Sequence, residues 1–108
     1  MLSFARQSYV RRRYPLDPDG DVDFSASPDE ITIPRASIQP GANTEVLGGR
    51  EAERVAWTIF QPTGHDITGR DFAWYEGALY RVLGEPQRWT GPTPATTHDV
   101  VLLERWEG

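Results

Sequence analysis

The chain has 108 residues, which is the length of one domain, so a single domain over residues 1–108 is expected. Eleven Lys and Arg against sixteen Asp and Glu give a formal net charge of −5, which argues against a protein that grips nucleic acid over its whole surface. There is no cysteine, which excludes disulfides, thiolate metal sites and cysteine nucleophiles.

The sequence contains no apolar run near the roughly 20 residues that cross a bilayer, and its first residues lack the apolar core of a secretion signal. A protein made in a cytoplasm, with no membrane partner, is therefore expected. Nine Pro and ten Gly recur without a fixed period, which is typical of turns between short strands.

The first expected strand covers residues 4–14, where aromatic and β-branched residues alternate loosely, and it ends before Pro15. Residues 15–30 are dense in Asp, Pro, Gly and Ser, and this composition predicts a surface loop. Phe24 is expected to pin that loop down.

Residues 31–38 predict a strand that lies at a sheet edge or contains a bulge, because Pro34 cannot donate a ladder hydrogen bond. The stretch 44–54 is expected to be a mobile loop, since Gly48 and Gly49 each cost a helix about 1 kcal/mol relative to Ala. Loops of this kind often carry function.

Residues 53–62 give the strongest strand signal, because Val55, Trp57 and Ile59 alternate on one side. After a turn-rich stretch, residues 71–83 predict a β-hairpin with a two-residue turn at Glu76-Gly77.

In the expected hairpin register, Tyr75 pairs with Ala78, residue 73 with 80, and residue 71 with 82. One face then carries Ala73, Tyr75, Tyr80 and Val82. The other face carries Arg81 and four large apolar side chains, Phe72, Trp74, Leu79 and Leu83. A solvated face is not normally so apolar, so one of the two faces is expected to meet another chain.

The last expected strand covers residues 98–106 and follows a Pro- and Thr-rich connection. The sum is about six short strands, long loops and little helix. We therefore expect a mainly β protein, a small single-domain β-barrel that is closed or half closed.

The acidic stretch 17–23 places carboxylates at alternate positions, as a calcium loop does. An EF-hand needs Gly at its sixth position and Glu at its twelfth, where this chain has Val22 and Pro28, so a solvated acidic loop is the preferred interpretation. The pairs His65-Asp66 and His98-Asp99 lack a nucleophile motif, and neighbouring strand residues point apart. No enzyme activity, metal or cofactor is expected.

The arginine run 11–13 lies in the first expected strand, where at most two of its side chains share a face. Arg11 and Arg13 are expected to form a rim that pairs with an acidic partner, with direct DNA contact and plain solvent exposure as the alternatives. Of the four tryptophans, Trp74 and Trp89 are the expected interface anchors, because one lies on the surplus apolar face and the other follows a proline break.

The second half of the sequence carries turn and aromatic motifs in a distinctive order. They are Asp71, Gly77, Tyr80, Val82, Gly84-Glu85-Pro86-Gln87-Arg88-Trp89, Gly91-Pro92-Thr93, His98 and Glu107-Gly108. Upstream, the same pattern includes Asp23-Phe24-Ser25, Gln39-Pro40-Gly41, Glu45 and Arg50. In this order and spacing, over nearly its whole length, the chain resembles head-to-tail stopper proteins from tailed phages of actinobacteria. These proteins are also called head-closure or head-completion proteins.

The resemblance implies a structural protein of the virion neck, made in the cytoplasm of a host bacterium. Such stoppers are small β-barrels that form a ring, six- or twelve-fold, under the portal and its adaptor. The ring closes the DNA channel after packaging and receives the tail, through a tail terminator or the tail tube. Double-stranded DNA passes without specific binding, since carboxylates in the channel repel phosphates.

Two sets of candidate residues follow from the resemblance and the sequence pattern. Those for contacts with subunits or partners are Phe72, Trp74, Leu79, Leu83, Trp89, Arg11 and Arg13. Those for a loop in the channel or at the adaptor are Gly41, Asn43, Glu45, Gly48, Gly49, Arg50, Asp19 and Asp21.

Three alternatives remain open at this point. In the first, the chain is another neck or tail component, such as an adaptor or a tail terminator, although an adaptor should contain more helix. In the second, it is a small β-barrel module that binds a peptide or carbohydrate through Trp74 and Trp89. In the third, it is a metal-dependent enzyme that uses His65, His98 and the acidic loop.

Overall fold

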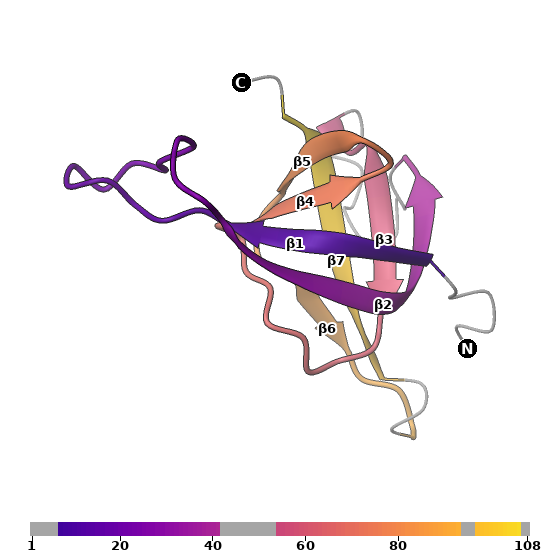
Figure 1. Ribbon diagram of the computed structural model, residues 1–108. Helices are drawn as coiled ribbons and strands as arrows, with labels where there is room; N and C mark the ends of the chain where they lie inside the picture. Colours follow the sequence, from indigo (N-terminus) through magenta and orange to yellow (C-terminus); the bar gives the residue numbers. More distant parts are fainter. Residues whose placement is uncertain (1–6, 42–53, 94–96, 107–108) are drawn as a thin grey trace.

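The computed structural model describes residues 7–41, 54–93 and 97–106, which form seven β-strands and no α-helix. The strands are β1 (Gln7–Arg13), β2 (Asp29–Pro40), β3 (Trp57–Gln61), β4 (Phe72–Tyr75), β5 (Ala78–Val82), β6 (Gln87–Trp89) and β7 (His98–Arg105). Six of them close an antiparallel barrel in the order β1, β2, β3, β7, β5, β4, and β6 lies outside it on the first half of β7 (Figure 1). The expected small β-barrel is confirmed, in its closed form.

The bend of β2 allows the barrel to close. Its first part, to Ala36, pairs with β1, and its last part, from Ser37, pairs with β3. Within the first part, between Ile33 and Ala36, the register with β1 shifts, and Arg35 adopts a left-handed conformation with φ 59°. Of the two alternatives for the strand around Pro34, the bulge is confirmed, and its extra residue turns the sheet toward β3.

The β4–β5 hairpin has the register expected from the sequence. Tyr75 pairs with Ala78, and the ladder ends at the Val82 N–H, which donates to the Asp71 carbonyl at 3.2 Å. Glu76 and Gly77 have φ angles of 49° and 77°, the positive values that a two-residue type I′ turn requires at both positions.

The inner face of that hairpin belongs to the barrel core. The core residues are Tyr9, Ile33, Ala36, Ile38, Ile59, Ile67, Ala73, Tyr75, Tyr80, Val82, Val101 and Leu103. Trp57 packs edge-on against Tyr75 at a centroid distance of 5.3 Å. Each fully buried aliphatic side chain contributes roughly 1.5–3 kcal/mol relative to an exposed one, so this face stabilises the barrel.

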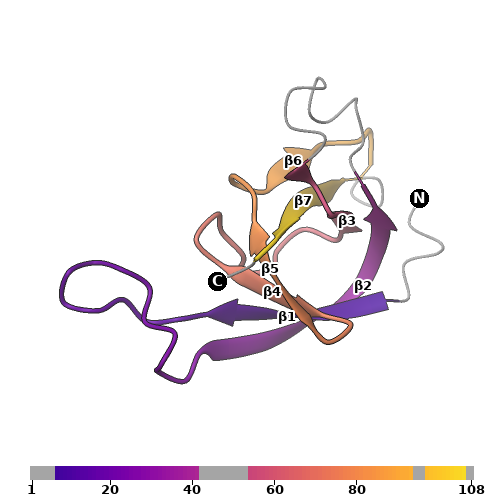
Figure 2. The ribbon, with the colours of Figure 1, turned by 90° about the horizontal axis from the view of Figure 1, so that it is seen from above.

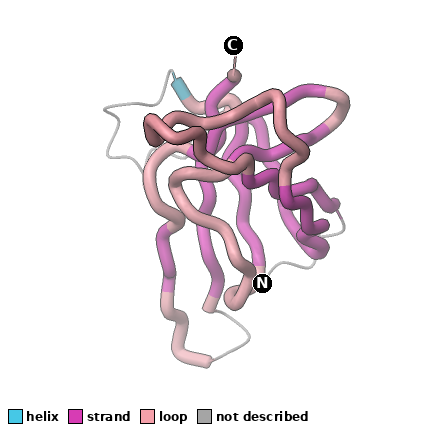
Figure 3. Tube along the Cα trace, turned by 60° about the vertical axis from the view of Figure 1, so that its left-hand side comes forward, coloured by secondary structure: helices cyan, strands magenta, loops and turns pink. Residues whose placement is uncertain are grey.

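Residues 14–28, which we call the arm, connect β1 to β2 and extend away from the barrel (Figures 1 and 2). The arm is almost entirely loop, whereas the strands lie in the barrel (Figure 3). Its tip is folded on itself, since the Asp17 carboxylate accepts the N–H groups of Asp19 and Asp21, each at 2.9 Å. The surface loop expected over residues 15–30 is confirmed, apart from its last two residues, which begin β2.

Candidate functional site

The outer face of the β4–β5 hairpin is apolar, as expected, but one of its residues is covered by the protein itself. Phe72 is only 4% exposed. Three rings surround it, those of Tyr14, Phe24 and Trp106, at centroid distances of 5.7, 5.3 and 5.3 Å. The expectation that Phe72 offers surface to another chain is therefore wrong, because the arm and the end of β7 already cover it.

Phe24 connects the arm to the barrel. Its ring stacks on Trp106 at 5.6 Å and tilts against Tyr14 at 4.9 Å, while its remaining surface stays exposed. The expected role of Phe24 in pinning the loop is confirmed. We call Tyr14, Phe24, Phe72 and Trp106 the aromatic cluster.

A second part of the outer face remains open to solvent. Val10, Trp74 and Leu79 pair in register across β1, β4 and β5, and we call them the outer row. Trp74 is 36% exposed, and the guanidinium carbon of Arg12 lies 4.4 Å from the centre of its indole ring. This cation–π contact orients the ring and leaves part of it free for a further contact.

Leu83 lies on a different patch from the outer row. It packs, together with Phe60, against the buried side chains of Val55, Val100 and Leu102. These residues form a small apolar cluster outside the barrel core, and only part of the Leu83 side chain faces solvent.

The three arginines of β1 are engaged within the chain. Arg11 is 1% exposed and donates to the Asp29 carboxylate at 3.0 Å, and Arg12 pairs with Glu30 at 2.6 Å. Arg11 therefore cannot form the expected rim, because strand alternation turns it inward with Tyr9. The acidic partner of these side chains is the chain itself.

Arg13 holds the base of the arm to the segment before β4. It donates two hydrogen bonds to the fully buried Asp71, at 2.8 and 2.9 Å, and two to Asp66, at 3.0 and 3.1 Å. These hydrogen bonds raise the pKa of Arg13 and lower the pKa of Asp66. Arg13 thus joins two segments far apart in the sequence, and its charge is compensated.

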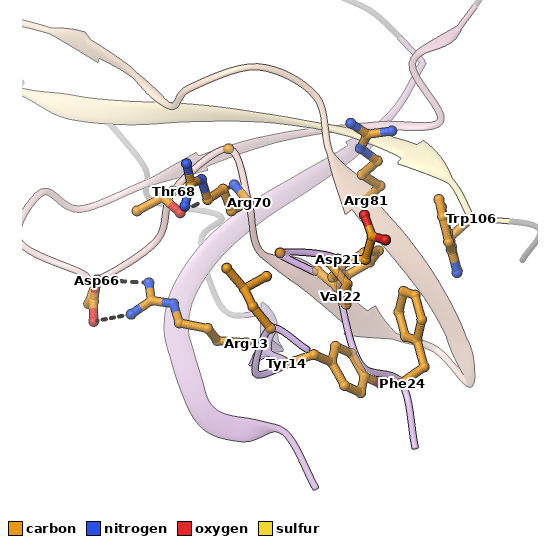
Figure 4. A pocket seen from close by; sticks show the side chains of 14 residues that line it. Arg13, Tyr14, Asp21, Val22, Phe24, Asp66, Thr68, Arg70, Arg81 and Trp106 are labelled. Atoms are coloured by element: carbon orange, nitrogen blue, oxygen red, sulfur yellow. Dashed lines mark hydrogen bonds and ion pairs between the residues drawn. The ribbon is translucent and has the colours of Figure 1, made fainter. Parts of the chain in front are cut away.

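A hollow of about 1020 Å³ lies between the arm and the barrel (Figure 4). The aromatic cluster lines it, together with Leu16, Val22 and Asp21 from the arm and Arg13, Asp66 and Thr68. Two further arginines, Arg70 and Arg81, also line it. The sequence did not identify Leu16, Arg70 or Arg81 as residues of a partner site, because they come from three separate segments without a shared motif.

The Gly84-Glu85-Pro86 break is a brace between two segments. The Glu85 carboxylate accepts the Gly69 N–H at 2.7 Å, and a side chain at Gly69 would collide with Glu85 and with the Gly84 carbonyl. Gly84, with φ 72°, then turns the chain out of β5, so that β6 pairs with the first half of β7.

Trp89 is exposed, but it does not share a site with Trp74. Trp89 pairs with His98 at the start of β7, whereas the outer row is bonded just past the end of β7, where the Trp106 N–H donates to the Leu79 carbonyl. Eight strand residues separate these points, a distance of roughly 26 Å along β7. A single ligand site formed by both tryptophans is therefore not supported.

The two sets of loop candidates have different outcomes. Asp19 and Asp21 are exposed on the arm, and Gly41 follows β2 with φ 75° and donates its N–H to the Ala56 carbonyl. Five further candidates lie outside the described residues, as does most of the loop expected over 44–54. They are Asn43, Glu45, Gly48, Gly49 and Arg50.

In both histidine–aspartate pairs, the carboxylate is engaged by an arginine. Asp66 pairs with Arg13, and Asp99 pairs with Arg88 at 3.1 Å. The described residues contain no group of three or more His, Asp or Glu side chains arranged to hold a metal ion. In the same part of the chain, no helix has the length and apolar character needed to cross a membrane.

No protein-family model matches this chain, and no curated protein matches its sequence.

Proposed function

We propose that this protein is a head-to-tail stopper of a tailed phage, a subunit of the ring that closes the DNA channel below the portal and adaptor and receives the tail. The observation that carries the proposal is the outer row: Val10, Trp74 and Leu79 form a continuous apolar strip on the outside of a barrel whose core is already complete. A partly exposed tryptophan with aliphatic neighbours is typical of the centre of a protein interface.

Three further features support a ring component. The barrel is closed, so its strand ladder offers a rigid frame on which a contact surface keeps its shape. The arm extends from this frame and is acidic at its tip, as suits a part near a DNA channel that must not bind phosphate. The order of motifs described for the sequence, including the Gly-Glu-Pro brace, resembles that of stoppers.

In the proposed ring, the outer row of one subunit lies against a different surface of its neighbour. Such a head-to-tail contact repeats around a closed ring without a two-fold axis. The weak contact of a single pair becomes effective when the portal and adaptor arrange all copies at once.

The experiment that tests the proposal is electron microscopy of a lysate of the phage that carries this gene, with the gene deleted. We expect empty or leaking heads beside finished, unattached tails, and tailed particles again when the gene is supplied from a plasmid. Intact tailed particles without the gene would overturn the proposal. Heads that retain DNA beside tails of abnormal length would point instead to a tail terminator.

A further inference from the structure

The tip of the arm is folded as a small unit of its own. Leu16 and Val22 form a bridge across it, and the Asp23 N–H donates to the Pro15 carbonyl at 2.9 Å. The hydrogen bonds that residues 15–26 make with described residues all stay within the arm. Residues 15–23, which we call the tip unit, therefore have the internal bonds needed to move as one body.

The tip unit is joined to the barrel at its base. There the rings of Tyr14 and Phe24 pack on Phe72 and Trp106, and these contacts carry no hydrogen bond that fixes an angle. Beyond the aromatic cluster, the hollow of about 1020 Å³ separates the tip unit from the barrel (Figure 4). The cluster is thus a pivot, and the hollow is the space into which the tip unit can tilt.

Both walls of the hollow carry apolar side chains. Leu16 and Val22 line it from the tip unit, and Phe72 and Trp106 line it from the barrel. Leu16 is 54% exposed, more than any other large apolar side chain among the described residues. Closing the hollow would remove apolar surface on both walls from water, which is favourable.

Two opposite charges also line the hollow from its two walls. Asp21 belongs to the tip unit and Arg81 to β5, and both are exposed (Figure 4). Neither forms an ion pair with a described residue. The carboxylate of Glu104, the cross-strand neighbour of Arg81, is bound by Arg54 at 2.9 Å. Asp21 is therefore the carboxylate that Arg81 meets when the hollow closes.

The other charges around the hollow are matched on the barrel side. Arg13 is paired with Asp66 and Asp71. The Glu85 carboxylate accepts the Gly69 N–H and so lies beside the segment that carries the third arginine of the hollow. The hollow as a whole is close to neutral, so its charges favour contact between its own two walls.

We propose that the arm is a strap that closes onto its own barrel. The tip unit tilts about the aromatic cluster until Leu16 packs on Trp106 and the Asp21 carboxylate pairs with the Arg81 guanidinium. An exposed ion pair and a small apolar contact give only a modest gain, so the open arrangement described above and the closed one are both populated. This inference goes beyond the proposed function, which needs only the outer row and the ring.

The test measures the distance between the arm and the barrel in the full chain. The chain has no cysteine, so spin labels attach only at two introduced ones, Pro18→Cys and Arg105→Cys, both at exposed positions that do not line the hollow. Double electron–electron resonance at low salt should give two distances, the longer of which matches the open arrangement. Raising the salt from about 0.02 M to about 0.5 M should lower the share of the shorter distance about twofold, because salt screens an exposed pair.

Variants assign the contact to its residues. Asp21→Arg should lower the share of the shorter distance about threefold, and adding Arg81→Asp should restore it, because the exchanged charges again attract. Asp19→Arg is the matched control, since Asp19 lies in the same turn but does not line the hollow, and it should leave both distances in place. Leu16→Ser should lower the share of the shorter distance at every salt concentration, because it removes apolar surface without altering charge.

Three results would overturn the inference: a single distance equal to that of the open arrangement, equal losses in Asp19→Arg and Asp21→Arg, or no recovery when the charges are exchanged. Each variant changes an exposed side chain, and an unchanged melting temperature checks that the barrel stays folded. None of these results depends on the microscopy of the gene deletion, so the two proposals fail separately.

Discussion

The barrel and the arm are stabilised by different interactions, although they belong to one domain. The barrel has a closed ladder of strands around an aliphatic core in which Ile33, Ile59 and Leu103 are completely buried. The arm has a single isolated bridge, between Leu16 and Val22. It is attached through Phe24 and through the ion pairs of Arg13 with Asp66 and Asp71, which we call the Arg13 clamp. The barrel is therefore the rigid frame, and the arm is a surface element whose position depends on a few contacts.

The largest expected effect comes from opening the barrel core. Leu103→Ala removes a fully buried side chain between β3 and β5 and should lower the free energy of unfolding by about 2–5 kcal/mol. Denaturant unfolding measures this loss, with the exposed control Leu16→Ala expected to change stability by less than about 0.5 kcal/mol. Equal effects of the two substitutions would contradict the distinction between frame and arm.

A smaller effect is expected when the arm is detached. Phe24→Ala removes three ring contacts of a side chain that is partly solvated, so we expect a loss of about 1–2 kcal/mol. Limited proteolysis should then cut residues 14–28 faster than in the wild type, while the barrel fragments stay resistant. Phe24→Tyr keeps the ring and serves as the control. An unchanged rate of cleavage in Phe24→Ala would show that the cluster does not hold the arm.

The smallest effect concerns the Arg13 clamp and depends on pH. Arg13 lowers the pKa of Asp66, so the folded state holds this carboxylate ionised to lower pH than the unfolded chain does. The stabilisation is present above the unfolded pKa of about 3.9 and is lost as the pH falls through the lower, folded value. The difference in unfolding free energy between wild type and Asp66→Asn should thus be constant near neutral pH and disappear in acid. A difference that grows in acid would contradict the clamp.

Much of the barrel could be predicted from local sequence. The Glu76-Gly77 turn fixes the hairpin register because both residues must adopt positive φ, and Pro34 signals the bulge in β2 because it cannot donate to a ladder. Strand β6 could not be predicted from the pattern, since it has only three residues and lies outside the barrel, paired with β7 alone.

The surfaces were harder to predict because alternation tells which residues share a face and not what covers it. The sequence correctly grouped Phe72 with Trp74, but Phe72 is covered by Phe24, which lies 48 positions earlier, while Trp74 is not. Alternation also placed Arg11 and Arg13 on one side, yet that side faces inward, where Arg11 is buried. Long-range contacts of the arm decide the first outcome, and the closing of the barrel around the inward face of β1 decides the second.

The most direct measurement of the central claim is the yield of infectious particles when the phage deletion is complemented with Trp74→Glu together with Leu79→Lys. We expect a folded protein, checked by thermal unfolding, that leaves heads and tails unjoined, because both changes place charge on the outer row. Trp89→Glu, an exposed tryptophan away from that row, is the matched control and should restore more particles. A normal yield from the folded double variant would contradict the claim that the outer row is the subunit contact.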